Sequence, residues 1–530
     1  MLAHPTTFKR RQLDMALSRC PLLEVSRNYP SEARPGRCSD ALRNPRPASK
    51  HHVTVGSKQK GKFILSRIKL RILSCSSLGL LFVSQFLGQQ SNPFQGSVPS
   101  GAASSTPLPL TLDDAIQRGL KFNLGLLQSD VASQTARAER ILALSTLLPQ
   151  VTGSLTETEE QLNLRTLGLN IPPNPYVKIP TIVGPFSYTA AQANVSAKIL
   201  DWSAHRTFKS AKASEEAARL SVQDARDLVT QAVAGAYLQV IADSSREESI
   251  NAQVATDEAL YKKASDQHNA GTAAGIDVLR AQVQLKTEQQ QLLAQRNQLA
   301  KDKLALGRVI GLPPGQAFSI ADTTPFAPLS GITQEQAIQL ALAQRPDYQS
   351  AKKQVQAAQQ TLGAARAEWY PTVGLSGFYG DTGPTLANSH GVFTINGALN
   401  FNIFNGGRIR GDVEKARAAL KQRSDDLADL GAQVEVQVRN AFLDLQSAAD
   451  QVAVARDNLS LSNQTLDQAR DRFTAGVTDT IEVVQAQGTV AAANDNLIGA
   501  LYAHNLAKVS LARALGQADQ QIKKFIEVAK

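Results

Sequence analysis

The side chains that most often perform chemistry are few in this chain and poorly placed for catalysis. Its 530 residues include seven histidines, at His4, His51, His52, His205, His268, His390 and His504. None of those after residue 110 forms a metal-spaced pair, and no nucleophile elbow or dinucleotide fingerprint accompanies them. The three cysteines, at Cys20, Cys38 and Cys75, all precede residue 76, so later residues can form neither a disulfide nor a thiolate metal site. We therefore expect no enzyme, no cofactor and no metal centre.

Two short stretches near the N-terminus imitate functional motifs. The sequence GSKQKGKF, residues 56–63, nearly matches the phosphate-binding loop, but Phe63 stands where a metal-binding hydroxyl is required. Cys75 follows a leucine and a serine, as a lipidated cysteine does, but its apolar run mostly comes after it, which is the wrong order. We interpret both matches as chance.

The N-terminal region has the pattern of a secretory signal. Residues 1–71 carry 16 Lys and Arg against four Asp and Glu, so the remaining chain is nearly neutral and has no basic stripe for nucleic acid. An apolar stretch, residues 72–87, and a polar segment rich in Gln, Ser, Pro and Gly follow. A stretch of 16 residues is short for a membrane span, although a retained anchor is the alternative. We expect a signal peptide and flexible segment over residues 56–105, preceded by a disordered or wrongly started extension over residues 1–55.

The rest of the chain contains an internal sequence duplication. The tract AGTAAGIDVLRAQ, which starts at Ala270, returns 205 residues later as AGVTDTIEVVQAQ, which starts at Ala475. Upstream, Ala115 matches Ala337 at a spacing of 222. These spacings far exceed those of solenoid repeats. We expect two large repeats, residues 106–330 and 331–516, followed by a tail over residues 517–530.

Each repeat is expected to contain the same succession of elements. Thr111 and Thr333 can cap helices that run to about residues 147 and 368, where prolines follow. Apolar and polar residues then alternate with period two, which predicts strands over about residues 150–160, 188–201, 371–380 and 392–404. Proline-free, alanine-rich stretches predict long helices over residues 203–267 and 407–473, with return helices over residues 276–311 and 481–516.

This succession predicts a mainly helical protein that contributes strands to a transmembrane barrel. The alternation alone also fits a soluble sheet with one face on a core. Transmembrane strands need roughly 9 to 11 residues, and four strands cannot close a barrel without leaving unpaired backbone groups in lipid. We therefore expect an oligomer, with 8 strands from two chains or 12 from three. Helices of about 65 residues reach roughly 100 Å and would continue the barrel as a coiled α-helical tunnel.

Several motifs resemble those of the TolC-like outer membrane efflux proteins, also called outer membrane factors. They are PLTLDDAIQRGL from residue 107, ILDWSAHR from Ile199, IFNGGRIRG from Ile403, and the duplicated tracts at Ala270 and Ala475. The resemblance covers about residues 110–516. It implies a homotrimer with a 12-stranded barrel in the outer membrane lipid, a tunnel in the periplasm and a partly α/β collar. It also implies a periplasmic adaptor, or membrane fusion protein, and an inner-membrane RND or ABC pump, serving tripartite efflux or type I secretion.

The resemblance also assigns candidate site residues. In the family the periplasmic end closes like an iris with acidic rings, and the matching positions here are Asp277 and Glu482. Gln485 stands where a second aspartate is frequent, so one ring is expected to be missing. Ordinary acids favoured at a helix N-terminus are the alternative interpretation. The other candidates at the tips are Arg280 and Asp479 as salt-bridge partners, and Gly271, Gly275, Gly476 and Val477 as adaptor contacts. Separately, the position of Trp202 and Phe404 at the strand-to-helix turns makes them candidates for an interfacial aromatic belt, with simple packing as the alternative.

A structural or adaptor-type periplasmic coiled-coil protein is the competing function. It would explain the long helices. It would not explain four alternating strands, so we favour the channel.

Overall fold

The computed structural model describes residues 92–168, 176, 180–322, 332–478, 480–519 and 522. The expected signal peptide, the N-terminal extension and Cys75 lie outside these ranges. The described residues belong to one compact unit. Within the described ranges, no helix is both long and apolar enough to cross a membrane.

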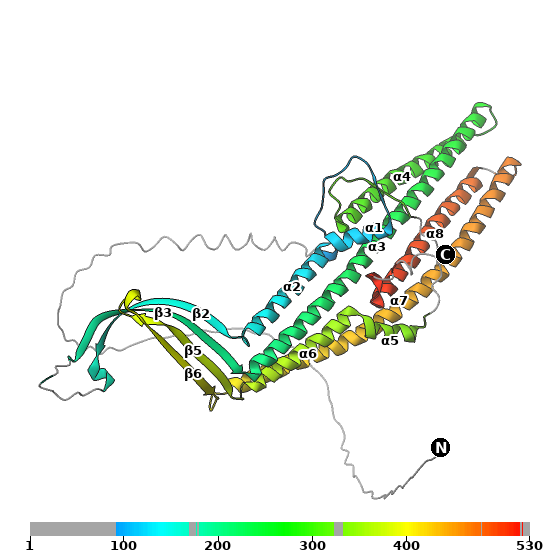
Figure 1. The fold of residues 1–530 in the computed structure, drawn as a ribbon. Coiled ribbons are helices and arrows are strands. Elements are labelled where there is room, and N and C mark those ends of the chain that lie inside the picture. Colours follow the sequence, from blue (N-terminus) through cyan, green and yellow to red (C-terminus); the bar gives the residue numbers. More distant parts are fainter. Residues whose placement is uncertain are drawn as a thin grey trace, which may run out of the picture. The chain divides into compact units, whose positions relative to one another are not determined.

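The two repeats fold into matching successions of elements (Figure 1). The first contains α1 (Leu112–Phe122), α2 (Leu124–Ser145), β2 (Gln150–Asn163), β3 (Ile182–Leu200), α3 (Trp202–Asn269) and α4 (Gly275–Val309). The second contains α5 (Gln334–Gln344), α6 (Pro346–Ala367), β5 (Thr372–Gly383), β6 (His390–Asn400), α7 (Arg408–Thr474) and α8 (Thr480–Ala514). Two short strands, β1 (Leu108–Leu110) and β4 (Phe318–Ile320), pair in parallel beside the helices of the first repeat.

Both expected helix starts are confirmed, but the prediction of one continuous helix in each repeat is wrong. Thr111 and Thr333 each form a capping box with the side chain three residues later. The first helix then breaks at Asn123, whose Oδ1 accepts a hydrogen bond from the Gly125 N–H at 2.9 Å and so caps a new helix. The second breaks before Pro346, because a residue that precedes proline is disfavoured in helical conformation.

The four long strands form one antiparallel sheet in the order β2-β3-β5-β6. β3 begins six residues earlier than predicted, at Ile182. β6 ends earlier than predicted, at Asn400, because its partner β5 begins only at Thr372, after Pro371. Asn402 has already left the ladder, and its Nδ2 donates to the carbonyl oxygen of Glu368 at 2.9 Å.

The long helices α3 and α7 contain 68 and 67 residues, which corresponds to roughly 100 Å each. The two helices bury residues at equivalent positions. We call residues that are equivalent in the two repeats, 205 positions apart, repeat mates. Val229 and Val233 of α3 are fully buried, and so are their mates Val434 and Val438 of α7. α3 packs against α2, α4, α6 and α8, and α7 packs against α5, α6 and α8. The repeated sequence therefore produces a repeated packing pattern.

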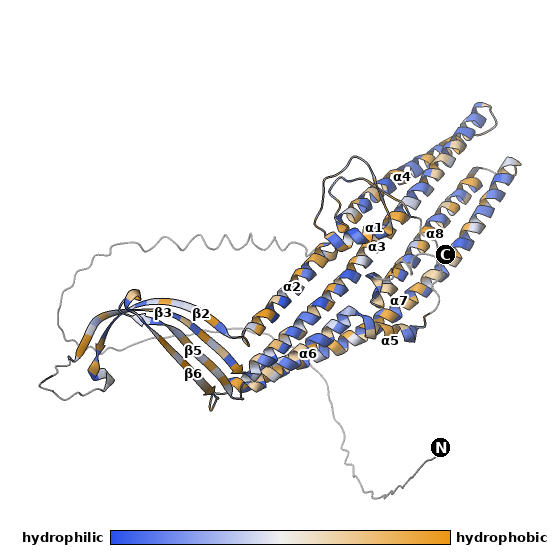
Figure 2. Cartoon of the chain, in the orientation of Figure 1, coloured by the Kyte–Doolittle hydropathy of each residue, from blue (hydrophilic) through white to orange (hydrophobic). Residues whose placement is uncertain are grey.

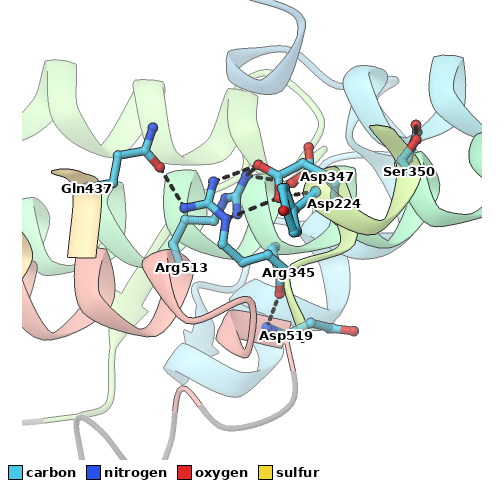
Figure 3. Close-up of polar contacts among 10 residues, drawn as sticks. Asp224, Arg345, Asp347, Ser350, Gln437, Arg513 and Asp519 are labelled. Atoms are coloured by element: carbon cyan, nitrogen blue, oxygen red, sulfur yellow. Dashed lines mark hydrogen bonds and ion pairs between the residues drawn. The ribbon is translucent and has the colours of Figure 1, made fainter. Parts of the chain in front are cut away.

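A buried network of charged side chains holds the α5/α6 break against α3, α7 and α8 (Figure 3). The Arg345 guanidinium is 2% exposed and binds Asp347 through two hydrogen bonds, of 3.1 and 2.6 Å, while donating to Gln437 at 2.7 Å. Arg513 of α8 donates to Asp224 of α3 at 2.5 Å. Burial alone would raise the pKa of Asp347, but Arg345 holds that pKa below its ordinary value. At Asp224 burial prevails over Arg513, and the pKa is raised.

We expect Arg345→Ala to destabilise the helical region by about 2–3 kcal/mol, because partly buried Asp347 would lose its main cation and keep only Arg513 at 3.8 Å. Urea unfolding of the purified protein, followed by far-UV circular dichroism, measures the change. Arg423→Ala is the matched control, since Arg423 forms an exposed 3.8 Å ion pair with Asp426 and is expected to change stability by less than about 1 kcal/mol. Equal effects of the two substitutions would contradict a stabilising role for the network.

Candidate functional site

One face of the sheet is apolar and uncovered in the single chain. Directly opposed residues point to the same side of a sheet, and the register places Val151, Val195 and Ile395 on one side. The large apolar side chains of this face are 42–72% exposed; they are Val151, Leu155, Val195, Leu375, Tyr379, Phe393, Ile395 and Leu399. Hydrophobic and hydrophilic residues are interspersed along the strands in Figure 2. An exposed apolar face of this size marks a surface for lipid or another apolar partner.

The opposite face of the sheet is mostly polar, and it is uncharged over its central part. The register brings polar residues to this side, namely Thr152, Ser154, Gln192, Asn194, Ser196, Ser376, Thr394 and Asn396. Two apolar residues lie among them, Phe378 between Asn194 and Thr394, and Val392 opposite Gly380. Asn194 donates to the Ser154 hydroxyl at 3.1 Å. Polar side chains on one face and apolar ones on the other are the alternation of a barrel strand between water and lipid.

Both outer strands of the sheet have one free side. β2 pairs only with β3, and β6 pairs only with β5, in the part of the chain that the structure describes. Each edge therefore presents unpaired backbone N–H and C=O groups. Such edges are tolerated in water but cost several kcal/mol per group in hydrocarbon.

Exposed aromatic side chains gather where the strands meet the helices. Trp202 is 49% exposed and Phe404 is 89% exposed. The structure adds Trp369 and Tyr370, which are 48% and 57% exposed and which we did not predict. Their signal was their position directly before Pro371, at the end of α6 and the start of β5.

The two helix reversals at the far ends of the long helices have the same backbone. Gly271 and Gly476 have φ values of +75° and +71°, where a side chain would be strained. The Gly271 N–H donates to the His268 carbonyl at 2.9 Å, and the Gly476 N–H donates to the Phe473 carbonyl at 3.1 Å. The next N–H in each tip also turns back to the ending helix, which completes a Schellman motif. Both reversals therefore require glycine at this position.

The candidate acids lie at these reversals, and each pairs within its own hairpin. Asp277 accepts from Arg280 at 3.5 Å, one turn further along α4. Glu482 pairs with Arg472 of α7 at 3.0 Å and also accepts a short hydrogen bond from the Thr478 hydroxyl. We did not predict Arg472, because its contact crosses the reversal.

The other tip candidates are mostly at the surface. Gln485 and Gly275 are exposed, and Val477 is 69% exposed. Asp479 lies outside the described residues. Between the two hairpins, the Lys263 ammonium lies 5.0 Å from the centre of the Phe473 ring, a cation–π contact. The described residues contain no group of three or more His, Cys, Asp or Glu that could hold a metal ion.

One surface of α3 is covered by other helices, whereas the equivalent surface of α7, formed by the repeat mates of the same residues, is uncovered. Leu238 of α3 is 3% exposed and lies with Ile241 and Ala242 along a groove shared with α8. Its mate Leu443 is 62% exposed and lies along an open groove of α7. Ser249 of α3 accepts a hydrogen bond from Asn494 of α8 at 2.6 Å, whereas its mate Val454 is 68% exposed.

The return helices show the complementary difference. Val509 of α8 is fully buried, whereas its mate on α4, Leu304, is 68% exposed. Leu293 of α4 is also 68% exposed, and its mate Ile498 lies in the groove between α3 and α8. In a single chain, therefore, α8 covers α3, while the equivalent surfaces of α7 and α4 remain open.

Comparison with known proteins identifies relatives of this fold. The family model described as outer membrane efflux protein matches residues 115–312 and 337–517. The chain is 25% identical over 429 residues to the pyoverdine export outer membrane protein OpmQ of Pseudomonas aeruginosa, covering 77% of this chain and 86% of that protein. It is 28% identical over 191 residues to the cation efflux system protein CusC of Escherichia coli, covering 34% and 40%.

Solved structures of outer membrane channels share the fold. The CmeC channel of Campylobacter jejuni aligns with a TM-score of 0.66 at 17% identity, covering 82% of this chain and 95% of that one. VceC of Vibrio cholerae aligns with a TM-score of 0.66 at 20% identity, covering 76% and 96%.

The family match falls on both repeats, and its two segments begin at Ala115 and Ala337, two positions that match each other in the sequence duplication. It thus covers the strands, both reversals and the long helices that build the two-faced sheet and the tips. This chain belongs to the outer membrane efflux protein family, and it is a TolC-like efflux channel of the outer membrane rather than an enzyme.

Proposed function

We propose that three copies of this chain form the exit duct of a tripartite export complex. The observation that carries the proposal is the open four-stranded sheet, which has one apolar face and two unpaired edges. Three such sheets joined edge to edge give a closed 12-stranded barrel, with the apolar face toward lipid. The long helices then continue the duct into the periplasm, toward an adaptor and an inner-membrane RND or ABC pump.

Three copies explain the polar face better than two. A barrel of eight strands is filled by its own side chains, whereas a wider one leaves a lumen. The polar face carries Thr152, Asn194 and Asn396, whose uncharged groups suit contact with water. A dimer would crowd these side chains into a filled interior.

The repeat symmetry indicates how neighbouring copies meet. Within one chain, α8 of the second repeat covers α3 of the first. The mates of these helices are α4 and α7, whose equivalent surfaces are open. The same packing is completed if α4 of one copy covers α7 of the next, and repeating the step around an axis closes a ring of six hairpins.

A disulfide test follows from the hydrogen bond between Asn494 and Ser249, because their repeat mates are Gln289 and Val454. We expect the pair Gln289→Cys and Val454→Cys to crosslink between copies under mild oxidation, giving a covalent trimer on a non-reducing gel. The chain contains no cysteine after Cys75, so background crosslinks are low.

The matched control pairs Gln289→Cys with Val436→Cys, which lies on the same exposed stripe of α7 but about 27 Å away along the helix. This pair and each single variant should give no ladder. A ladder that stops at dimers would contradict the trimer, and equal crosslinking of the control would contradict the alignment of α4 with α7.

If the apolar face of the sheet contacts lipid, adjacent residues of β6 should differ in their tolerance of a charged side chain. Ile395→Lys places a charge on the apolar face and should cost about 2–4 kcal/mol in the membrane, so the yield of heat-modifiable trimer in outer membrane fractions should fall. Asn396→Lys places the same charge on the polar face and should leave that yield near wild type. Similar yields for the two variants would argue against a lipid-facing apolar surface.

The tip acids are proposed to line the periplasmic entrance. Three copies would bring Glu482, and separately Asp277, into rings of like charge that favour cations. Mutual repulsion within a ring would raise the pKa of some members. The alternative is that each acid only stabilises the N-terminus of its helix. At the position of Gln485, where a second acidic ring is frequent in the family, the wall of the entrance would be uncharged.

Single-channel recording separates these alternatives. Glu482→Gln should lower the preference for cations over anions if Glu482 lines the pore. Asp467→Asn is the matched control for lost charge, because Asp467 lies on α7 about two turns before the reversal and its side chain is 74% exposed. Unchanged ion selectivity in Glu482→Gln would leave only the helix-stabilising role.

The remaining candidates complete the proposed duct. Gly271, Gly275, Gly476 and Val477 lie at the exposed tips and are proposed to contact the adaptor. Arg280 holds Asp277 and is proposed to control its position, and Asp479 is proposed as a further salt-bridge partner at the second tip. Trp202 and Phe404 are proposed to lie in the aromatic belt at the membrane interface. The names of the relatives OpmQ and CusC, which refer to pyoverdine export and cation efflux, support an export role without selecting a substrate.

A further inference from the structure

Two buried carboxyl groups lie in the first helical hairpin, which is formed by α3 and α4. Both face the contact between these two helices, which we call the seam. Asp257 of α3 is 1% exposed and Glu288 of α4 is 7% exposed. They lie at the level of an apolar cluster formed by Val254, Leu285 and Leu292. Acidic side chains at such positions are rare unless they are paired or protonated.

Neutral side-chain amides provide hydrogen bonds to only some of the carboxyl oxygens of Asp257 and Glu288. Gln253 donates to one oxygen of Asp257 at 3.2 Å, and Gln284 donates to Glu288 at 3.1 Å. The other Asp257 oxygen, Oδ2, is buried and has no hydrogen-bond partner. The seam therefore contains an acceptor that lacks a donor.

The charged groups on the surrounding helices are engaged elsewhere. On α4, Arg280 pairs with Asp277, Lys286 donates to Gln289, and Arg296 pairs with Glu247 of α3. On α3, Glu258 accepts from Gln289, and Lys263 lies over the Phe473 ring. On α8, Glu482 pairs with Arg472 and Asp495 pairs with Arg246. In the part of the chain that the structure describes, no cation forms an ion pair with Asp257 or Glu288.

The second hairpin shows that the packing does not require acids at this level. The repeat mates of Asp257 and Glu288 are Ser462 and Ala493, which are 4% and 1% exposed. These residues are equally buried but uncharged. The carboxyl pair is therefore a specific property of the first hairpin.

We propose that Asp257 and Glu288 form a proton-binding site inside the first hairpin, where proton uptake tightens the seam between α3 and α4 and proton loss loosens it. With one proton bound, one carboxyl group becomes a hydrogen-bond donor and the pair no longer carries two charges. With none bound, two carboxylates repel each other in a poorly solvated layer.

The direction of the pH effect follows from the folded environment. Burial, and then the charge of Glu288, raise the pKa of Asp257 from its ordinary 3.8 to about 6, and burial also raises the pKa of Glu288. An acid whose pKa is higher in the closed hairpin binds its proton more tightly there than in the open one. Stability of the seam therefore falls as pH rises from about 4 to about 6, and it stays low at higher pH.

The consequence for the channel rests on the proposed trimer. The pair lies about 20 Å from the reversal at Gly271, so it controls the part of the hairpin that carries Asp277. Only the first hairpin of each chain has the site, so three of the six proposed hairpins would tighten in acid and the other three would not.

Hydrogen exchange of the purified full-length protein tests the site. Protection factors, corrected for the intrinsic exchange rate, are compared at pH 5 and pH 7.5 for peptides covering residues 250–262 and 281–293. We expect about tenfold higher protection at pH 5, the change that linkage gives for a pKa raised to about 6. Peptides covering the mates, residues 455–467 and 486–498, provide an internal control and should respond little to pH.

Substitutions assign the response to the pair. The double variant Asp257→Asn with Glu288→Gln should be well protected at both pH values, because neutral isosteres remove the repulsion. Glu258→Gln, an exposed acid next to Asp257, should keep the wild-type pH response. A response that persists in the double variant, or that is equal in both hairpins, would overturn the proposal.

Two further outcomes remain distinguishable. Protection at pH 7.5 produced by Mg²⁺ and not by acid would replace the proton site with a cation site. A normal pH response in protein that fails the crosslinking and membrane tests would refute the proposed duct while supporting the proton site, because exchange within the hairpin requires neither export nor a membrane.

Discussion

The constraint on which the rest of the structure depends is the pair of open edges on the four-stranded sheet. In water an edge strand can bond to solvent, but in hydrocarbon each unpaired N–H or C=O costs several kcal/mol. The sheet presents an apolar face suited to lipid, yet β2 and β6 have no second neighbour in the described chain. Association with further copies is the way to satisfy both edges, and the rest of the chain must then fit the resulting ring.

The long helices also require further copies of the chain, but for a different physical reason. α3 and α7 are rich in alanine, so each residue contributes little buried apolar area and stability requires neighbours on several sides. α7 buries Val434 and Val438 on one side, but it leaves Leu443 and Val454 exposed. A helix with apolar stripes on two sides is incomplete in one chain. The sheet and the helices therefore demand the same kind of partner.

The sequence allowed the order of the four long strands and of the long helices with their return helices to be predicted, because periodicity and duplication are properties of long stretches. Details set by single contacts were less predictable. The break at Asn123 was missed because helical periodicity continues across it, and only the capping bond to Gly125 reveals the new start. The partner of Glu482 was missed because Arg472 reaches it across a reversal whose geometry depends on Gly476. The acid pair was missed because its burial depends on the rotational phase of two helices.

Comparison of the two repeats separates what the architecture requires from what is particular to one position. Gly271 and Gly476 have the same left-handed backbone, so the reversal itself demands glycine. Asn123 and Arg345 occupy equivalent breaks, but one caps a helix locally while the other ties α6 to α7 through Gln437. Where repeat mates have the same burial and different charge, packing cannot be the reason for the charge. Asp257 and Glu288 fall into this class, so their carboxyl groups call for an explanation in terms of protons or ions rather than of fold.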